Sequence, residues 1–330
     1  MYDGKTIGAV VPAYNEADHI GGVIDTLPEF VDRAYVVDDG STDDTFQVIL
    51  DHAARANERD ADAPKTATGV TLDPRVVPVA HEENRGVGGA IKTGYQRALA
   101  DGVDVTLVIA GDGQTEPDIV ERIVAPVAAG DADYAKGNRL GDRDRDAMPR
   151  HRQFGNFVLS FLTKVASGYW GVMDPQNGST AISREALEDV GIEEMYEDYG
   201  YCNDLLVRLN AIDATIADVP RRAVYEDETS HISLRSYVPK VSSLLARDFA
   251  WRLKAKYFDH GSYPVPLLYV LGILGTGVGV AAATGTLLFA VRGAFNAFAV
   301  LVASALFVVL AMVLDRTANS DLAVTADEPP

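Results

Sequence analysis

Hydrophobic and polar positions follow two alternating patterns over the first 130 residues of the chain. Short apolar runs rich in β-branched residues occupy residues 6–11, 34–37, 75–79 and 105–109, and this continuous apolar character predicts buried parallel strands. Helical patterns separate them at residues 20–27, 45–56, 88–100 and 117–128. The alternation predicts an open α/β sheet, in which ligands bind beyond the carboxyl ends of the strands.

The hydrophobic pattern changes after residue 260. Charged residues are absent from residues 261–291 and, after Arg292, from residues 293–314. A helix of about 20 apolar residues crosses ~30 Å of hydrocarbon, so we predict a hairpin of two spans in the cell membrane. Two buried helices of a soluble core are the alternative. Four basic residues lie at positions 247–256, and the positive-inside bias places the preceding domain in the cytoplasm.

These patterns divide the chain into four parts. We predict an α/β domain at residues 1–232, an amphipathic interfacial segment at 233–260, two spans within 261–315 and an acidic tail at 316–330. Trp251 and its basic neighbours suit a helix in the lipid interface. A second apolar face, at positions 157, 158, 161, 162 and 165, has helical spacing, and we expect it to pack against the core rather than the membrane.

The composition is strongly acidic, with 48 Asp and Glu against 29 Lys and Arg, which gives a net charge of −19. This charge disfavours nucleic acid as a partner. A surface of this kind is typical of adaptation to high salt and suggests a halophilic archaeal host.

Polar residues gather where the predicted strands end. Tyr14 follows the first strand, and Asp38 and Asp39 follow the second. Some of these residues can serve as turn and helix-cap residues, but two adjacent carboxylates exceed what a cap requires. They can accept hydrogen bonds from a base N–H or a ribose hydroxyl, and Tyr14 can stack on the base. The glycine-rich run at 84–90 opens a helix and lets the backbone approach a phosphate or sugar, although it is neither a dinucleotide fingerprint nor a P-loop.

Two oxygen-bearing side chains follow the fourth strand. Asp112 and Gln114 offer hard ligands of the type that Mg²⁺ or Mn²⁺ prefers, with diphosphate oxygens and water filling the other positions. A capped turn before the helix at residue 117 is the alternative interpretation.

The motifs VPAYNE, VDDGSTDDT, NRGVGGA and GDGQTEPD, in this order and spacing, resemble those of the inverting glycosyltransferases of family 2. The segments KGNR, MPRHR and DPQNG and the C-terminal hairpin are similar to those of dolichyl-phosphate or polyprenyl-phosphate sugar synthases. The resemblance implies the GT-A fold and a nucleotide-sugar donor. It also implies that Asp112 and Gln114 hold the metal and that seven residues line the nucleotide pocket: Pro12, Tyr14, Glu16, Asp38, Asp39, Asn84 and Gly88.

The sequence departs from the family pattern at the fourth strand. Ala110 stands where the family often has the first acid of a D-x-D motif, which removes one metal or ribose contact. The Q-x-x-R-W motif of processive polysaccharide synthases is also absent, so transfer of a single sugar is favoured.

An anionic lipid acceptor fits the basic residues that follow. A phosphate monoester is mostly ionised at neutral pH and needs no strong general base. Arg139, Arg150 and Arg152 carry guanidinium groups that match phosphate oxygens, and we expect them to bind the acceptor phosphate. The alternative is a solvated loop, since residues 143–152 mix acids and bases.

We therefore expect a membrane enzyme that moves one hexose from a UDP- or GDP-sugar to dolichyl or polyprenyl phosphate, with Asp112 and Arg139 closest to the reaction. Gln176, Asn177 and His231 are expected to contact sugar, acceptor or diphosphate. One alternative is a transferase acting on a lipid-linked oligosaccharide or a lipid hydroxyl, which needs a general base. Glu197, Asp198 and Asp204 are candidates for this base, and we favour one of the two aspartates. Another is a non-catalytic membrane scaffold of the same fold.

Overall fold

The computed structural model describes residues 1–62, 72–113, 117–138, 150–220, 234–289 and 294–325. Its core is an eight-stranded sheet with the strand order β3-β2-β1-β4-β6-β5-β7-β8. The N-terminal half of the sheet is parallel, as the apolar runs predict, and it contains four strands: β1 (Ile7–Ala13), β2 (Arg33–Asp38), β3 (Val76–Ala80) and β4 (Val105–Val108).

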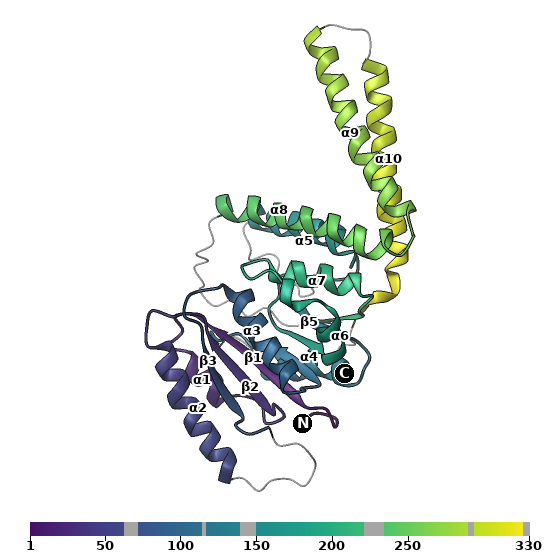
Figure 1. Cartoon of the computed structure of the whole chain (residues 1–330). Coiled ribbons are helices and arrows are strands. Elements are labelled where there is room, and N and C mark those ends of the chain that lie inside the picture. Colours follow the sequence, from purple (N-terminus) through teal and green to yellow (C-terminus); the bar gives the residue numbers. More distant parts are fainter. Residues whose placement is uncertain (63–71, 114–116, 139–149, 221–233, 290–293, 326–330) are drawn as a thin grey trace.

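Helices cover both faces of the sheet (Figure 1). One face packs against α1 (Ile20–Asp25), α2 (Thr45–Asp62) and α4 (Pro117–Ala128). The other packs against α3 (Val87–Ala100), α6 (Arg184–Asp189) and α7 (Tyr201–Ala211). The four N-terminal helices agree with the predicted helical patterns, so the expected βα alternation is confirmed.

The second half of the sheet contains an antiparallel strand that the sequence patterns did not predict. Strand β6 (Thr180–Ser183) runs antiparallel to β4 and to β5 (Tyr134–Asn138), which pairs in parallel with β7 (Ile216–Pro220). The sheet is therefore mixed, although mostly parallel.

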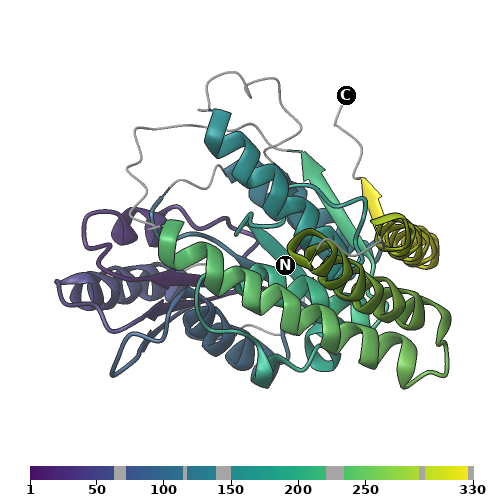
Figure 2. The same cartoon turned by 90° about the horizontal axis from the view of Figure 1, so that it is seen from above.

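Two long helices form a further layer over the α/β domain. Figure 2 shows α5 (Arg150–Ser167) beside α8 (Leu234–Arg252), on the side from which the C-terminal hairpin projects. We expected the apolar face of α5 to be in the core, but Val158, Phe161 and Leu162 are 36, 43 and 40 % exposed. The core side of α5 is formed instead by Leu159, Thr163 and Ala166, because the helix packs against α7 and α8 rather than flat against the sheet.

The hairpin consists of α9 (Pro264–Phe289) and α10 (Ala294–Ala318), which extend away from the α/β domain (Figure 1). The short π-helix η3 (Leu253–Phe258) connects α8 to α9. Both hairpin helices are long and apolar enough to cross a membrane, with mean hydropathies of 1.9 and 2.9. Large apolar side chains such as Leu274 and Phe298 are more than 60 % exposed, which favours membrane spans over the buried helices of a soluble core.

Small residues let the two hairpin helices approach each other closely. A Cβ atom at Gly272 would lie 2.5 Å from Val308 Cγ2, and one at Gly279 would lie 2.7 Å from Leu301. A Cβ atom at Gly275 would overlap the Ser304 hydroxyl. Small residues at such contacts are typical of helix pairs in a bilayer.

The end of the chain returns to the sheet. After α10, the short helix η4 (Ser320–Leu322) leads into strand β8 (Ala323–Thr325), which pairs in parallel with β7. The segment that we predicted to be an acidic tail, residues 316–330, therefore contributes a strand to the sheet edge, and its last five residues, 326–330, lie outside the described part of the chain.

Candidate functional site

The loops after β1 and β2 are joined into one unit. Asn15 adopts a left-handed conformation (φ 56°), its amide donates to Ser41 Oγ at 2.9 Å, and its side-chain oxygen accepts from the Thr42 amide at 2.9 Å. The Glu16 amide likewise donates to Thr45 Oγ1 at 2.8 Å. These bonds bring Tyr14, which is 45 % exposed, to the same edge as the carboxyl end of β2.

Asp38 presents a buried carboxylate oxygen at this edge. The residue is 4 % exposed, and its Oδ2 accepts from the Ser41 amide at 3.3 Å. Its Oδ1 is buried and has no hydrogen-bond partner in the described part of the chain. A buried polar atom of this kind is costly unless a donor reaches it, so the atom fits a donor group on a bound ligand.

Asp39 links β2 to the third loop. Its Oδ1 lies 2.7 Å from His81 Nδ1 and accepts from the Arg85 amide at 2.9 Å. His81 is held from its other side by Thr93 Oγ1 at 2.9 Å. Asp39 therefore orients the loop that contains Asn84, whose own side-chain oxygen accepts from the Gly86 amide at 3.0 Å.

Residues 196–197 hold this third loop in place, although their sequence indicated only a candidate acid. The Glu197 carbonyl accepts from the Gly89 amide at 2.9 Å, and a Cβ atom at Gly88 would lie 2.5 Å from the Tyr196 carbonyl oxygen. Glu197 Oε1 accepts from Arg85 at 2.8 Å and from Lys92 at 3.0 Å. These bonds lower the pKa of Glu197, chiefly through Arg85, so the side chain holds the loop and is a poor proton acceptor.

The other two acids proposed as alternative bases are also engaged in the structure. Asp198 forms an ion pair with Lys240 of α8. Asp204 is 2 % exposed and accepts from the Tyr196 amide and from Arg208 Nε, both at 2.9 Å. Asp198 therefore holds the segment before α7 against α8, and Asp204 holds that segment against α7, so the geometry does not favour general-base chemistry at either.

Asp248 is a further buried acid, on α8 beside Asp204. Burial, followed by repulsion from Asp204, raises the pKa of Asp248 to about 6, although Arg247 donates to its Oδ1 at 2.9 and 3.0 Å. Because the folded state retains a proton that the unfolded chain releases near pH 4, the free energy of unfolding should fall as the pH rises from about 4 to about 6.

Asp248→Asn should remove this pH-dependent fall in the free energy of unfolding and make the protein more stable than wild type at pH 7. Unfolding midpoints of the full chain in detergent at pH 4 and pH 7 check this expectation. Asp204→Asn is the matched control and should lower the midpoint at pH 7, because Asp204 accepts from Arg208. Equal stability losses for Asp248→Asn at both pH values would contradict the assignment.

Asp112 follows β4 and is half-buried beside the first loop. A Cβ atom at Gly111 would lie 2.6 Å from the Pro12 carbonyl oxygen, so the loop after β4 packs directly on the carboxyl end of β1. Gln114 lies outside the described residues. Within the described residues no group of three His, Cys, Asp or Glu side chains converges. The donor set thus fits a metal held by one carboxylate and completed by ligand phosphates and water, a common arrangement for Mg²⁺.

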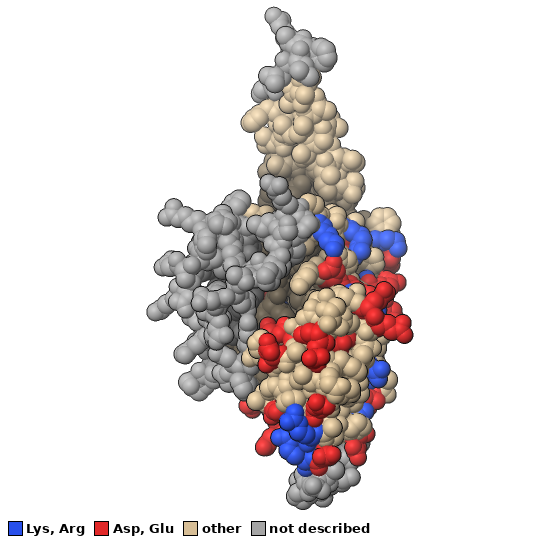
Figure 3. All heavy atoms as spheres, turned by 90° about the vertical axis from the view of Figure 1, so that its left-hand side faces the viewer, with Lys and Arg blue, Asp and Glu red and all other residues tan. Residues whose placement is uncertain are grey.

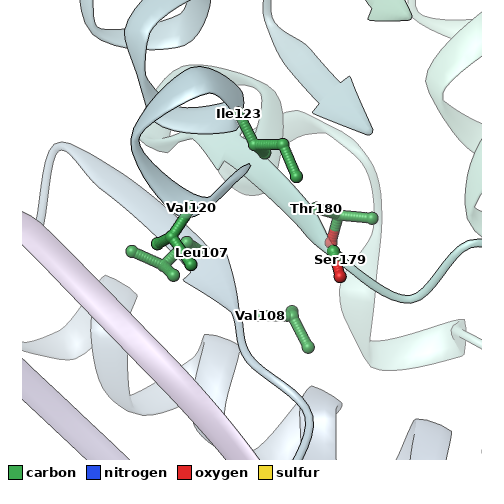
Figure 4. Close-up of a pocket in the computed structure, with 6 residues that line it drawn as sticks. All are labelled: Leu107, Val108, Val120, Ile123, Ser179 and Thr180. Atoms are coloured by element: carbon green, nitrogen blue, oxygen red, sulfur yellow. The ribbon is translucent and has the colours of Figure 1, made fainter. Parts of the chain in front are cut away.

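A small cavity lies below this edge (Figure 4). It is lined by Leu107 and Val108 of β4, Val120 and Ile123 of α4, and Ser179 and Thr180 at the start of β6. The lining is mostly apolar, so we assign the cavity to the core beneath the site rather than to a ligand subsite.

The carboxyl end of β5 carries a buried polar cluster centred on Asp218. Lys136 is 1 % exposed and donates to Asp218 Oδ1 at 3.1 Å and to the Met173 carbonyl at 2.5 Å. Asp218 Oδ2 accepts from Asn138 Nδ2 at 2.9 Å and from the Met173 amide at 3.1 Å. Burial raises the pKa of Asp218 despite the adjacent Lys136. The cluster fixes the backbone just before Arg139 against the loop at residues 173–178.

The remaining predicted residues divide into two groups. The Asn177 amide group is 3 % exposed and is used within its own loop, by Asp174 Oδ2 and the Ser179 amide, whereas Gln176 is half-buried. The side chains of the other predicted acceptor and diphosphate contacts lie outside the described part of the chain; these residues are Arg139, Arg150, Arg152 and His231. Of these four, Arg150 and Arg152 belong to the first turn of α5, whose backbone is described.

Comparison with known proteins gives consistent results. The family model for glycosyl transferase family 2 matches residues 9–191. The chain is 30 % identical to a UDP-N-acetylglucosamine–dolichyl-phosphate N-acetylglucosaminyltransferase of Methanococcus voltae over 225 residues, which cover 68 % of this chain and 87 % of that protein. It is 27 % identical to the polyprenol monophosphomannose synthase of Mycolicibacterium smegmatis, over 64 and 74 % of the two chains.

A solved structure supports the fold. Glucosyl-3-phosphoglycerate synthase from Mycobacterium tuberculosis, in complex with Mg²⁺ and UDP, superposes with a TM-score of 0.50 over 76 % of this chain and 79 % of that one, at 23 % identity. The expected GT-A arrangement, with a mostly parallel sheet and two apolar C-terminal helices, is therefore confirmed.

Proposed function

We propose, from the premise that the chain belongs to glycosyl transferase family 2, that it transfers one sugar from a nucleotide sugar to dolichyl or polyprenyl phosphate at a membrane surface. Family membership makes the chain a glycosyltransferase, and relatives named for dolichyl-phosphate and polyprenol-phosphate transfer support the acceptor class.

One observation carries the choice of a lipid acceptor. The α/β domain is fastened to a hairpin whose apolar side chains are exposed over most of its length, so the candidate site is held beside a bilayer. Helices α5 and α8 lie on the side of the domain from which the hairpin projects (Figure 1). Phe161 and Leu162 of α5 and Phe258 of η3 are exposed, and such apolar side chains suit contact with lipid.

The charge distribution supports a cytoplasmic orientation. On the face shown in Figure 3, one group of Lys and Arg side chains lies where the hairpin leaves the domain and another lies at the opposite end of the domain, and Asp and Glu are spread between them. Lys240, Arg247 and Lys254, of α8 and η3, have side chains 58, 58 and 73 % exposed. Basic residues next to membrane spans favour the cytoplasmic side.

In this proposal the chain's own residues mainly bind and orient the nucleotide sugar and the acceptor phosphate. Tyr14 stacks on the base, and Asp38 Oδ1 accepts from a base or ribose donor. The loop at residues 84–90, which Glu197 holds in place, approaches the sugar and diphosphate. A divalent ion at Asp112, with Gln114, would neutralise the departing diphosphate. Arg139, Arg150 and Arg152 hold the acceptor phosphate, whose ionised oxygen attacks the anomeric carbon without a protein base.

The first test is sugar transfer by the full chain in vesicles at high salt. Radiolabelled UDP-N-acetylglucosamine, UDP-glucose and GDP-mannose are compared with and without dolichyl phosphate and Mg²⁺. We expect label in an acid-labile lipid with one donor, only when dolichyl phosphate is present. Label that appears only with a lipid-linked glycan would overturn the monophosphate acceptor, and failure of every donor to bind in calorimetry would favour a scaffold.

Two variants then distinguish attack by an acceptor phosphate from base-assisted attack by an acceptor hydroxyl. Arg139→Ala should weaken use of the acceptor, whereas Asp198→Asn should leave the turnover rate nearly unchanged, because Asp198 pairs with Lys240 rather than facing a nucleophile. The reverse pattern would support base-assisted attack by a hydroxyl acceptor.

A further inference from the structure

An ion pair with no exposed surface joins the hairpin to the α/β domain. Arg252 is the last residue of α8, and Asp315 lies in the last turns of α10; both side chains are 0 % exposed. Arg252 Nη1 and Nη2 donate to the two carboxylate oxygens of Asp315 at 2.9 and 3.0 Å. This bidentate geometry fixes both the distance and the orientation of the two helices.

The other donors of Arg252 reach the α/β domain. Nε donates to the Ala166 carbonyl at 2.7 Å, Nη2 to the Val165 carbonyl at 3.1 Å, and Nη1 to Asn210 Oδ1 at 3.1 Å. A guanidinium has five N–H donors, and all five are used. One side chain therefore connects the carboxyl ends of α5, α7 and α8 with α10.

Asp315 is held just as fully. It accepts from the Tyr257 hydroxyl at 2.6 Å, from Asn319 Nδ2 at 3.2 Å and from Trp170 Nε1 at 3.3 Å. Asn319 in turn accepts from Asn210 Nδ2 at 2.9 Å. The contacts come from η3, from the loop after α5 and from the turn directly after α10.

The chain beyond this cluster enters the sheet that carries the acceptor side of the candidate site. Strand β8 pairs with β7, and β7 pairs with β5, whose last residue is Asn138. Both ends of the hairpin are thus fixed to the α/β domain, one through α8 and η3 and the other through α10 and β8.

We infer that Arg252 and Asp315 are positioning residues, which hold the α/β domain at a fixed height and tilt relative to the membrane-spanning hairpin so that the acceptor phosphate at the bilayer surface meets the edge of the sheet. The inference rests on the proposed function. A buried ion pair contributes little stability compared with a well-packed apolar pair, but its hydrogen bonds are directional. An apolar pair leaves the helices free to tilt, and a displacement of about 1 Å is enough to slow a bimolecular transfer by up to about 100-fold.

The test replaces the ion pair by apolar residues of similar size, Arg252→Met with Asp315→Leu, in the full chain reconstituted in vesicles. We expect kcat/KM for dolichyl phosphate in the bilayer to fall about 10- to 100-fold. Activity with a short, water-soluble prenyl phosphate and the affinity for nucleotide should stay within about twofold of wild type, because neither depends on the height of the domain.

A second readout does not require activity. Leu50 on α2 is exposed, whereas the single cysteine, Cys202, is buried, so a fluorophore attached to Leu50→Cys reports energy transfer to dyes in the bilayer. The Arg252→Met/Asp315→Leu pair should change or broaden this transfer. An equal loss of kcat/KM with both acceptors would overturn the positioning role. So would a variant in which both kcat/KM and the energy transfer are unchanged.

A matched control is available far from the hairpin. Arg33 donates to Asp101 at 2.7 Å, and the Tyr35 hydroxyl donates to the same carboxylate at 2.6 Å. Arg33→Met with Asp101→Leu should lower the stability of the protein but should not change the ratio of kcat/KM for the two acceptors. Should the Arg252→Met/Asp315→Leu protein fail to fold, Tyr257→Phe removes two bonds of the cluster, one to Asp315 and one from Asn319, and is judged by the same energy transfer. If wild type used neither acceptor, the proposed function would fail, while the energy transfer would still decide the positioning role.

Discussion

Asp112→Asn is expected to lower the rate of sugar transfer at saturating donor by at least about 100-fold. Asp112 is the carboxylate that follows β4, and Ala110, two positions earlier, supplies no second acid next to it. The change keeps the size of the side chain and removes the charge that holds a divalent ion against the leaving diphosphate. Because Asp112 is only half-buried, the fold should be retained.

Two measurements check this expectation. Nucleotide affinity should increase with Mg²⁺ in wild type and should be independent of Mg²⁺ in Asp112→Asn. Asp104→Asn, just before the opposite end of β4, is the control: Asp104 accepts from the amide and hydroxyl of Thr6 at 2.8 and 2.7 Å, so stability should fall while the turnover rate is kept. A variant at Asp112 with half of the wild-type rate would contradict the assigned role.

Asp38→Asn should weaken nucleotide binding about 10- to 100-fold, since a hydrogen bond to a charged group contributes about 1.5–3 kcal/mol. The buried Oδ1 of Asp38 has no donor in the described part of the chain, and a bound nucleotide would supply one. Titration calorimetry with UDP and GDP measures the loss and also shows which base the pocket prefers.

Asp43→Asn serves as the comparison within the same loop. Asp43 accepts from the Thr45 amide at 3.0 Å, and its pKa is lowered chiefly by the Thr45 hydroxyl, so its role lies in the start of α2. Its replacement should lower thermal stability without a change in nucleotide affinity. Equal affinity losses at Asp38 and Asp43 would mean that the loop as a whole, rather than the free oxygen, determines binding.

Local patterns were sufficient for the N-terminal half of the fold. The runs that became β1 to β4 are apolar and β-branched, and the helices between them have regular spacing, so each element could be predicted from its own residues. Since parallel strands end at one edge of a sheet, the same patterns also predicted that Tyr14, Asp38 and Asp112 would lie near one another.

Elements stabilised by distant partners could not be predicted in this way. Strand β8 is three residues long and carries no pattern of its own; it exists because β7 offers a free edge. The face of α5 was assigned wrongly because helical spacing shows that an apolar stripe exists, not whether protein or lipid covers it.

The sequence by itself determined the class of fold, the hairpin and the strand-end residues, because these depend on composition and on spacings within one element. Tertiary structure decided the roles of the acids. Glu197, Asp198 and Asp204 are equivalent as carboxylates in the sequence, and only the positions of Arg85, Lys240 and Arg208 show that each is engaged in holding the fold. The same holds for Arg252 and Asp315, which are 63 positions apart and whose ion pair depends on the path of the whole hairpin between them.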